Sequence, residues 1–177
     1  MSHLSQAEVS GRAARIRVVA FDVDGVCTDG RLYYGKDGEV LHAFHARDGL
    51  GIALARTAGI ILVAISGRVS ANVQARLSEL KVPHIRQGIM DKASELSNVL
   101  AEIGADWSET AFIGDDVNDL ACIQRAGLGF CPADAADDVP ARAHVVTRRR
   151  GGEGALREVI ECVLKARGLW RLEGEAK

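Results

Sequence analysis

Residues 18–30 read VVAFDVDGVCTDG, and this stretch indicates both the fold and the chemistry. The run of apolar and β-branched residues over 17–23 predicts a buried β-strand. Its end carries Asp22 and Asp24, two positions apart, and then Gly25. Side chains alternate along a strand, so the two carboxylates face the same way. An Asp-Gly turn would explain the glycine alone, whereas a bound cation would also explain why two like charges lie together.

Strand and helix patterns alternate along the rest of the chain. Strands are predicted at 17–23, 60–65, 84–86, 110–114, 128–130 and 144–146, and helices at 48–59, 69–80, 91–104, 116–126 and 154–166. We expect Asp48 to cap the first of these helices and Gly59 to end it. A β-hairpin with the turn GKDG is predicted over residues 31–46. This order is typical of an α/β fold with a doubly wound, Rossmann-like, mainly parallel sheet and an inserted hairpin.

Length and composition indicate one globular domain. The chain has 177 residues, of which 47% are apolar and 26% charged. We divide it into a polar N-terminal lead-in (1–15), a single domain (16–167) and a C-terminal tail (168–177). A net charge of -2 and no long apolar run argue against nucleic-acid and membrane partners. The four cysteines have no metal-ligand spacing and are expected to be reduced, which with the absence of a signal-like N-terminus favours the cytoplasm.

Polar residues follow four of the predicted strands or begin the helices after them. They are Asp22 and Asp24, Ser66-Gly67-Arg68, Asp91-Lys92, and Asp115-Asp116 with Asn118 and Asp119. In a parallel sheet the carboxyl ends of the strands meet at one edge, where ligands bind. Mg²⁺ prefers carboxylate oxygens together with water and substrate phosphate, and Asp22 and Asp115 are good candidate ligands. The set therefore predicts a Mg²⁺-dependent phosphoryl-transfer site.

The residue types assign a division of labour at this site. Asp22 as a nucleophile would split the reaction into formation and hydrolysis of an aspartyl-phosphate. Asp24 would protonate the leaving oxygen and later deprotonate water, which contributes roughly 10² to 10⁴ in rate. The Lys92 ammonium neutralises part of the negative charge, and the Ser66 hydroxyl with helix N-terminal amides would hold phosphoryl oxygens.

Four segments, DVDGVCTDG, ISGR, MDK and GDDVND, resemble in order and spacing the motifs of the haloacid dehalogenase superfamily of phosphotransferases. The resemblance covers about residues 17–166. It implies that Asp22 is the nucleophile and Asp24 the general acid and base, and that Ser66 and Lys92 bind the phosphoryl group. It also implies that Mg²⁺ is held by Asp22, Asp115 and the backbone carbonyl of Asp24. The implied supports of this metal cluster are Asp116 and Asp119.

An aspartate at position 24 is, by this resemblance, typical of phosphatases and mutases. Only about forty residues separate the first motif from ISGR, enough for a hairpin and a helix but not for a cap domain, which favours a capless phosphatase. The hairpin, FHARDGLGI and TRRRGGEGALREVIE further resemble the 3-deoxy-D-manno-octulosonate 8-phosphate phosphatases. That resemblance implies a homotetramer whose hairpins meet in a central core, with a glycine-rich C-terminal segment reaching a neighbour's active site.

The implied substrate is a sugar acid with a phosphate at one end and a carboxylate at the other. We expect it to be bound by Asp24, Arg47, Asp48, Gly67, Arg68 and Arg157, since guanidinium groups bind such anions in a bidentate manner. Tyr33 and Tyr34 are expected to pack at a subunit contact, and the roles of His42 and His45 stay open. The alternatives are the same chemistry on a nine-carbon keto-acid phosphate or another small sugar phosphate, or a homo-oligomeric binding module without turnover.

Overall fold

The fold is a six-stranded parallel sheet, seen in a computed structural model that describes residues 4–170. The strands are β1 (Val18–Phe21), β4 (Ile61–Ile65), β5 (His84–Arg86), β6 (Thr110–Ile113), β7 (Leu128–Cys131) and β8 (Val145–Val146). Their order is β5-β4-β1-β6-β7-β8, and every neighbouring pair is parallel. The chain leaves β1 toward β4 and later returns to β6 on its other side. The doubly wound α/β prediction is therefore confirmed, and β1 lies at the switch point where ligands bind in such sheets.

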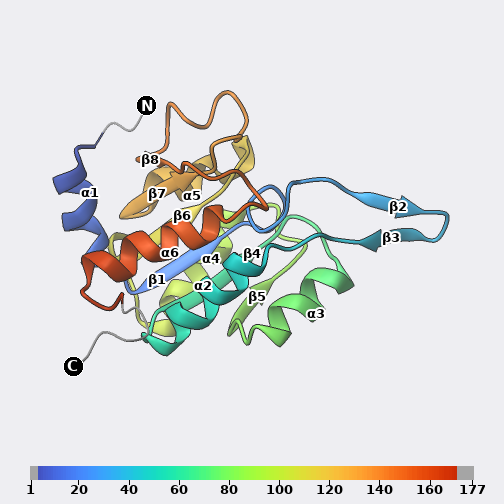
Figure 1. Cartoon of the computed structure of the whole chain (residues 1–177), viewed down its shortest axis with the longest axis horizontal. Coiled ribbons are helices and arrows are strands. Elements are labelled where there is room, and N and C mark those ends of the chain that lie inside the picture. The colour runs from blue at the N-terminus through green and yellow to red at the C-terminus, as the bar shows by residue number, and fades with distance from the viewer. Residues whose placement is uncertain (1–3, 171–177) are drawn as a thin grey trace.

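Helices cover both faces of the sheet (Figure 1). They are α1 (Gln6–Ala13), α2 (Ala46–Thr57), α3 (Ala71–Glu79), α4 (Lys92–Ile103), α5 (Leu120–Arg125) and α6 (Ala155–Ala166), with short 3₁₀ turns η1 (Trp107–Glu109) and η2 (Val117–Asp119). Side chains of α1, α2, α3 and α6 pack in one apolar cluster, and those of α4 and α5 in the other. β1 contributes to both, because Val19 and Phe21 face the first cluster while Val18 and Ala20 face the second.

The segment between β1 and β4 contains a hairpin and α2, and no cap domain is inserted into this described part of the chain. The hairpin strands β2 (Tyr33–Gly35) and β3 (Gly38–Leu41) are shorter than the predicted 31–46 and are antiparallel. They project from the domain as a two-stranded arm (Figure 1). Tyr33, Tyr34 and Leu41 are exposed on this arm.

The N-terminal stretch that we expected to be a polar lead-in contains a helix, α1. Ser5 and Glu8 form a reciprocal capping box at its start, a pattern visible in the sequence. Val9 and Ala13, four residues apart, are buried on one face of α1 and join the core. The stretch therefore belongs to the folded domain. Of the predicted tail, residues 171–177 lie outside the described residues.

Helix α2 begins earlier than predicted, and Asp48 is not its cap. The N-cap is His45, whose ring Nδ1 accepts the N–H of Arg47. Histidine is not a preferred N-cap residue, so propensity alone favours the aspartate three residues later. Asp48 lies inside the first turn and is buried. No described helix is long and apolar enough to cross a membrane, and all four cysteines are free thiols.

Candidate active site

The carboxyl ends of β1, β4 and β6 meet at a pocket of about 200 Å³. It is lined by Asp22, Asp24, Gly30, Gly67, Arg68, Lys92, Asp115, Asp116 and Asn118. The predicted nucleophile, acid, lysine and metal ligand are thus brought together from three strand ends and the first turn of α4. We call this space the catalytic pocket.

Lys92 forms the electrostatic centre of the site. Its Nζ donates to Asp119 Oδ1 at 2.7 Å and lies 2.8 Å from Asp22 Oδ1. The side chains of Lys92, Asp119 and Asp22 are 1%, 0% and 8% exposed, respectively. Burial lowers the pKa of Lys92, but the two carboxylates outweigh this and raise it above its usual value. A buried ammonium is stable only when paired in this way, so Lys92 is a charged and fixed component of the site.

Asp119 positions the loop that carries Asp115. Its Oδ2 accepts the N–H of Asp115 at 3.1 Å and that of Asp116 at 3.4 Å. The adjacent Gly114 is required, because a Cβ at this position would collide with the Asp119 side chain. With both oxygens engaged, Asp119 acts as a support for the site. Asp116 is exposed and its Oδ1 accepts the N–H of Val117 at 2.7 Å.

Three carboxylates gather at the base of the pocket. Oxygens of Asp22, Asp115 and Asp119 lie within 4.8 Å of one another. Burial, followed by the charge of Asp119, raises the pKa of Asp22 well above its usual value and that of Asp115 to about 6. Burial and mutual repulsion destabilise the ionised carboxylates, and a hard divalent cation bound between them would stabilise their charged form. This donor set fits Mg²⁺.

Gly25 holds the turn beneath these carboxylates. Its φ is 81°, and a Cβ there would collide with the carboxylate of Asp115. Gly25, which follows Asp22 and Asp24, thus allows Asp115 after β6 to approach the end of β1.

Asp24 lies at the pocket wall with its side chain 22% exposed. Its Oδ1 is 3.1 Å from Nε2 of His42, whose own side chain is 0% exposed. His42 follows β3, at the base of the hairpin arm. One of the two histidines left open by the sequence therefore contacts the predicted acid, whereas His45 caps α2.

The end of β4 provides the other wall. Ser66 is 2% exposed, and its Oγ accepts the N–H of Arg68 at 3.1 Å. Arg68 reaches the hairpin, where its Nη2 donates to the hydroxyl of Tyr34 at 3.2 Å. Gly67 and Arg68 both line the catalytic pocket, and their binding of substrate stays a prediction.

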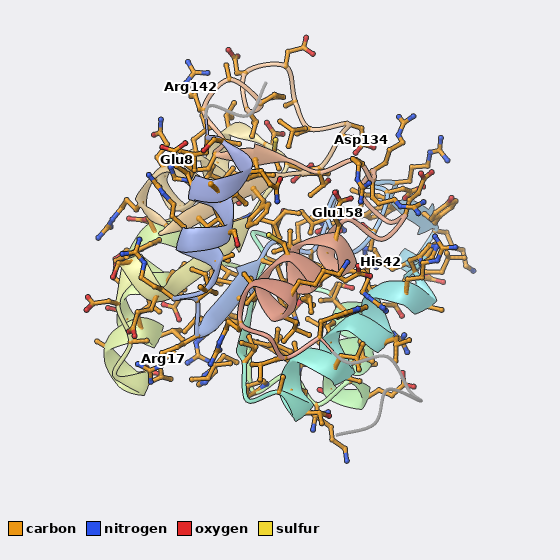
Figure 2. All side chains as sticks on the ribbon, turned by 60° about the vertical axis from the view of Figure 1, so that its left-hand side comes forward. Glu8, Arg17, His42, Asp134, Arg142 and Glu158 are labelled. Carbon is orange, nitrogen blue, oxygen red and sulfur yellow. The ribbon has the colours of Figure 1, made fainter. Side chains whose placement is uncertain are left out.

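Arg47 and Arg157 line a different space, a cavity of about 390 Å³. We call it the arginine cavity; its lining is Arg47, Leu50, Arg148, Arg149, Gly154, Arg157, Glu158 and Glu161. Glu158, labelled in Figure 2, is 3.2 Å from the Arg148 guanidinium. Among the described residues the two spaces share no lining residue. The geometry of a single chain therefore does not bring Arg47 or Arg157 to the catalytic pocket.

Asp48 is also placed apart from the pocket. It is 4% exposed, and its Oδ1 accepts the N–H of Arg157 at 2.7 Å, which ties the first turn of α6 to α2. Burial raises the pKa of Asp48 to about 6, although the N–H of Arg157 opposes this. Its observed contact is structural, in contrast to the substrate contact that we expected.

The glycine-rich segment after β8 approaches the catalytic loop of its own chain. Gly152 donates its N–H to the carbonyl of Val26 at 3.0 Å, and a Cβ at Gly151 would collide with the Gly25 carbonyl. This close approach lies within one chain and supports the turn that follows Asp24, whereas the predicted contact of this segment with a neighbour's active site stays a prediction.

Sequence reasoning did not assign four residues at this site. Gly30 and Asn118 line the pocket. Asn118 was among the polar residues at the end of the predicted strand 110–114 but had no role assigned, and Gly30 was not singled out. The contacts of His42 with Asp24 and of Tyr34 with Arg68 join positions 18 and 34 residues apart. No periodic pattern in the sequence signals contacts of that kind.

Comparison with known proteins agrees with this geometry. Residues 70–159 match the family model for haloacid dehalogenase-like hydrolases. The chain is 40% identical over 162 residues to the 3-deoxy-D-manno-octulosonate 8-phosphate phosphatase KdsC of Escherichia coli K12, covering 92% of this chain and 86% of that protein.

Two solved structures are similar over nearly their whole length. One is the 3-deoxy-D-manno-octulosonate 8-phosphate phosphatase of Moraxella catarrhalis in complex with magnesium, phosphate and KDO, with a TM-score of 0.90, 39% identity and coverage of 93% and 94%. The other is a probable YrbI family phosphatase of Pseudomonas syringae, with a TM-score of 0.91, 42% identity and 93% coverage of both chains.

Proposed function

The chain belongs to the haloacid dehalogenase-like hydrolase family, and we propose that it hydrolyses 3-deoxy-D-manno-octulosonate 8-phosphate to the keto-sugar acid and phosphate in lipopolysaccharide precursor synthesis. The enzyme is a phosphatase. The observation that carries the proposal is the buried Asp22–Lys92–Asp119 arrangement at the switch point, beside Asp24 and Asp115. The substrate is inferred from relatives of this activity at about 40% identity over most of both chains.

Asp22, Asp115 and the backbone carbonyl of Asp24 would hold Mg²⁺. When bound, this ion supplies positive charge that offsets the negative charge of the phosphoryl oxygens. Lys92 supplies further positive charge from its fixed position beside Asp22. The Ser66 hydroxyl accepts from Arg68, so its own O–H remains as a donor to a phosphoryl oxygen.

In the first step, an Asp22 carboxylate oxygen attacks phosphorus, and the bond between phosphorus and the sugar oxygen breaks. The electron pair stays on the sugar oxygen, which takes a proton from the Asp24 carboxyl group. The free keto-sugar acid leaves, and an aspartyl-phosphate remains on Asp22. Asp24 is thereby converted to the carboxylate that the next step requires.

In the second step, Asp24 accepts a proton from water while the water oxygen attacks phosphorus. The bond between phosphorus and Asp22 breaks, which releases inorganic phosphate and restores the Asp22 carboxylate. One side chain thus serves first as acid and then as base. Its position at the pocket wall, next to the end of β1, is suited to both.

Arg68 is the substrate-binding residue that the pocket supports best. Its guanidinium lies at the rim, fixed by the Tyr34 hydroxyl, where it is suited to bind a carboxylate or phosphate oxygen. Gly67 beside it has no side chain that would fill the space. Asp24 completes the substrate contacts that we propose.

We also propose that the enzyme is a homotetramer in the cytoplasm. Exposed apolar side chains on the hairpin arm, among them Leu32, Tyr33 and Leu41, favour an assembly through this arm. Four free thiols agree with a reducing compartment.

A phosphate-release assay with Mg²⁺ and a panel of sugar phosphates tests the function. We expect the eight-carbon keto-acid phosphate to be cleaved much faster than hexose phosphates. Comparable rates across the panel would refute the substrate, and a faster rate on the nine-carbon analogue would replace it. The matched control is Asp22→Asn, which should fold normally and retain less than roughly 10⁻⁴ of the wild-type rate. If the wild-type protein hydrolyses no phosphate ester, the proposal of a phosphatase is wrong.

A further inference from the structure

The contact between His42 and Asp24 has no role in the two steps of phosphoryl transfer proposed above. His42 Nε2 lies 3.1 Å from Asp24 Oδ1, and the imidazole is fully enclosed, with 0% of its side chain exposed. Its ring also lies against Phe44, with the two ring centroids 6.0 Å apart, and Phe44 packs on the apolar core. The histidine therefore contacts both Asp24 and an aromatic ring that packs on the core.

We propose that His42 is a positioning residue that fixes the carboxyl group of Asp24 for proton transfer. This rests on the proposed role of Asp24 as general acid and base. An Asp side chain is a broad rotor about χ2, and the Asp24 side chain is still 22% exposed. An ionised Asp24 carboxylate can only accept a hydrogen bond, so the buried imidazole then donates from Nε2 and holds Oδ1 in one place. The other oxygen, Oδ2, is then the one directed to the substrate.

The same contact determines which oxygen carries the transferable proton. With the imidazole donating to Oδ1, we place the proton of the acid form on Oδ2. From there it moves to the sugar oxygen as the bond to phosphorus breaks, and in the second step Oδ2 takes a proton from water. The first requirement of acid catalysis is that the acid lies within hydrogen-bond reach of the atom that it protonates. In this proposal His42 orients Asp24 so that Asp24 meets the requirement, and His42 itself does not contact the reacting atoms.

A positioning role predicts a dependence on the leaving group. An alkoxide leaving group, such as that of a sugar phosphate, needs a proton as it departs. The p-nitrophenolate ion is stable without one. Since kcat/KM reports only the steps through departure of the leaving group, a misplaced Asp24 lowers kcat/KM for an alkyl phosphate far more than for p-nitrophenyl phosphate.

The experiment compares His42→Ala with wild type on both substrates. We expect kcat/KM for the sugar phosphate to fall at least about tenfold, within the roughly 10² to 10⁴ that acid catalysis contributes. The value for p-nitrophenyl phosphate should change less than about threefold. His42→Gln keeps an N–H donor at a similar reach and should restore most of the loss.

His45→Ala is the matched control. His45 lies on the same segment and caps α2 through its contact with Arg47, so its loss should alter the melting temperature and leave the ratio of the two kcat/KM values unchanged. Equal losses on both substrates in His42→Ala, or no loss on either, would overturn the proposal. So would failure of His42→Gln to recover activity while its melting temperature matches that of wild type.

The result is separable from that of the proposed function. If the wild-type protein cleaves p-nitrophenyl phosphate and not the eight-carbon keto-acid phosphate, the substrate is wrong. The His42 comparison is then made with the alkyl phosphate that the wild type does cleave, and the same ratio decides it.

Discussion

The catalytic pocket and the arginine cavity are both polar, and both contain residues that the sequence marks as binding anions. In the catalytic pocket the charges are buried and tightly paired, as in Lys92 with its contacts of 2.7 and 2.8 Å. In the arginine cavity the Arg148 side chain is 90% exposed and meets Glu158 at 3.2 Å. The number of charged groups is therefore a poor guide to a site.

What distinguishes the two regions is the cost of keeping each charge where it is. A buried ion loses several kcal/mol of hydration and stays only if neighbouring groups compensate it, whereas exposed ion pairs cost and contribute little. The catalytic pocket maintains such a cost at Asp22, Asp115 and Lys92. This is the condition in which a phosphate and a cation gain most from binding.

The largest difference between the two regions should appear when one charge is removed from each. Lys92→Met leaves Asp22 and Asp119 buried without their cation, and we expect a loss of roughly 3–5 kcal/mol of folding free energy at pH 8 without Mg²⁺. Arg148→Met in the arginine cavity should cost less than about 1 kcal/mol. Urea unfolding of wild type and both variants measures the two losses of folding free energy. Equal losses would show that the burial of Lys92 does not make its charge more important for stability than the exposed charge of Arg148.

Asp48 provides the second test, because it is a buried charge outside the catalytic pocket. Its pKa is raised from 3.8 to about 6, so the folded state binds more protons than the unfolded state between these values, and stability falls as the pH rises through this window. Asp48→Asn keeps an oxygen to accept the N–H of Arg157 and removes the ionisation. The variant should gain up to roughly 3 kcal/mol relative to wild type between pH 4 and pH 7.

Urea unfolding of wild type and Asp48→Asn across that range provides the measurement. The quantity to compare is the difference in unfolding free energy between the two proteins at each pH. Asp22 and Asp115 also have raised pKa values, but they change the stability of both proteins equally. A difference that is flat with pH would show that Asp48 does not carry a raised pKa in the folded protein.

Prediction from the sequence succeeds where local rules suffice and fails where distant segments meet. Alternation along β1 and the parallel-sheet rule are enough to place Asp22, Asp24 and Asp115 at one edge of the sheet. The capping box that begins at Ser5 is equally local, since its two partners are three residues apart. By contrast, the tie between Asp48 and Arg157 joins positions 109 residues apart, and no local pattern encodes such a contact.

The arginine residues illustrate the same limit more sharply. Arg47, Arg68 and Arg157 have the same chemistry and were all expected to bind the substrate, yet only Arg68 lines the catalytic pocket within one chain. Residue type determines what a side chain is able to bind, while the packing of α2 and α6 determines where it lies.

A third, smaller effect concerns Mg²⁺ and pH. In the metal-free protein the pKa of Asp115 is about 6 and that of Asp22 is raised, so protons compete with the ion below pH 6. We expect the apparent Mg²⁺ dissociation constant, measured by calorimetry, to rise as the pH falls, by at least about tenfold per pH unit well below pH 6. An affinity independent of pH down to 5 would contradict the assignment of these ligands.

The smallest expected effect is the loss of Arg47, and it tests the boundary between the two regions most directly. Arg47→Ala should change kcat and KM by less than about threefold, whereas Arg68→Ala should raise KM roughly ten- to a hundredfold through loss of a charged hydrogen bond. Both variants remove one guanidinium, so the contrast isolates position from charge. If Arg47→Ala raises KM as much as Arg68→Ala does, the arginine cavity takes part in substrate binding. Since one chain keeps the two spaces apart, that outcome would require a neighbouring subunit to bring them together.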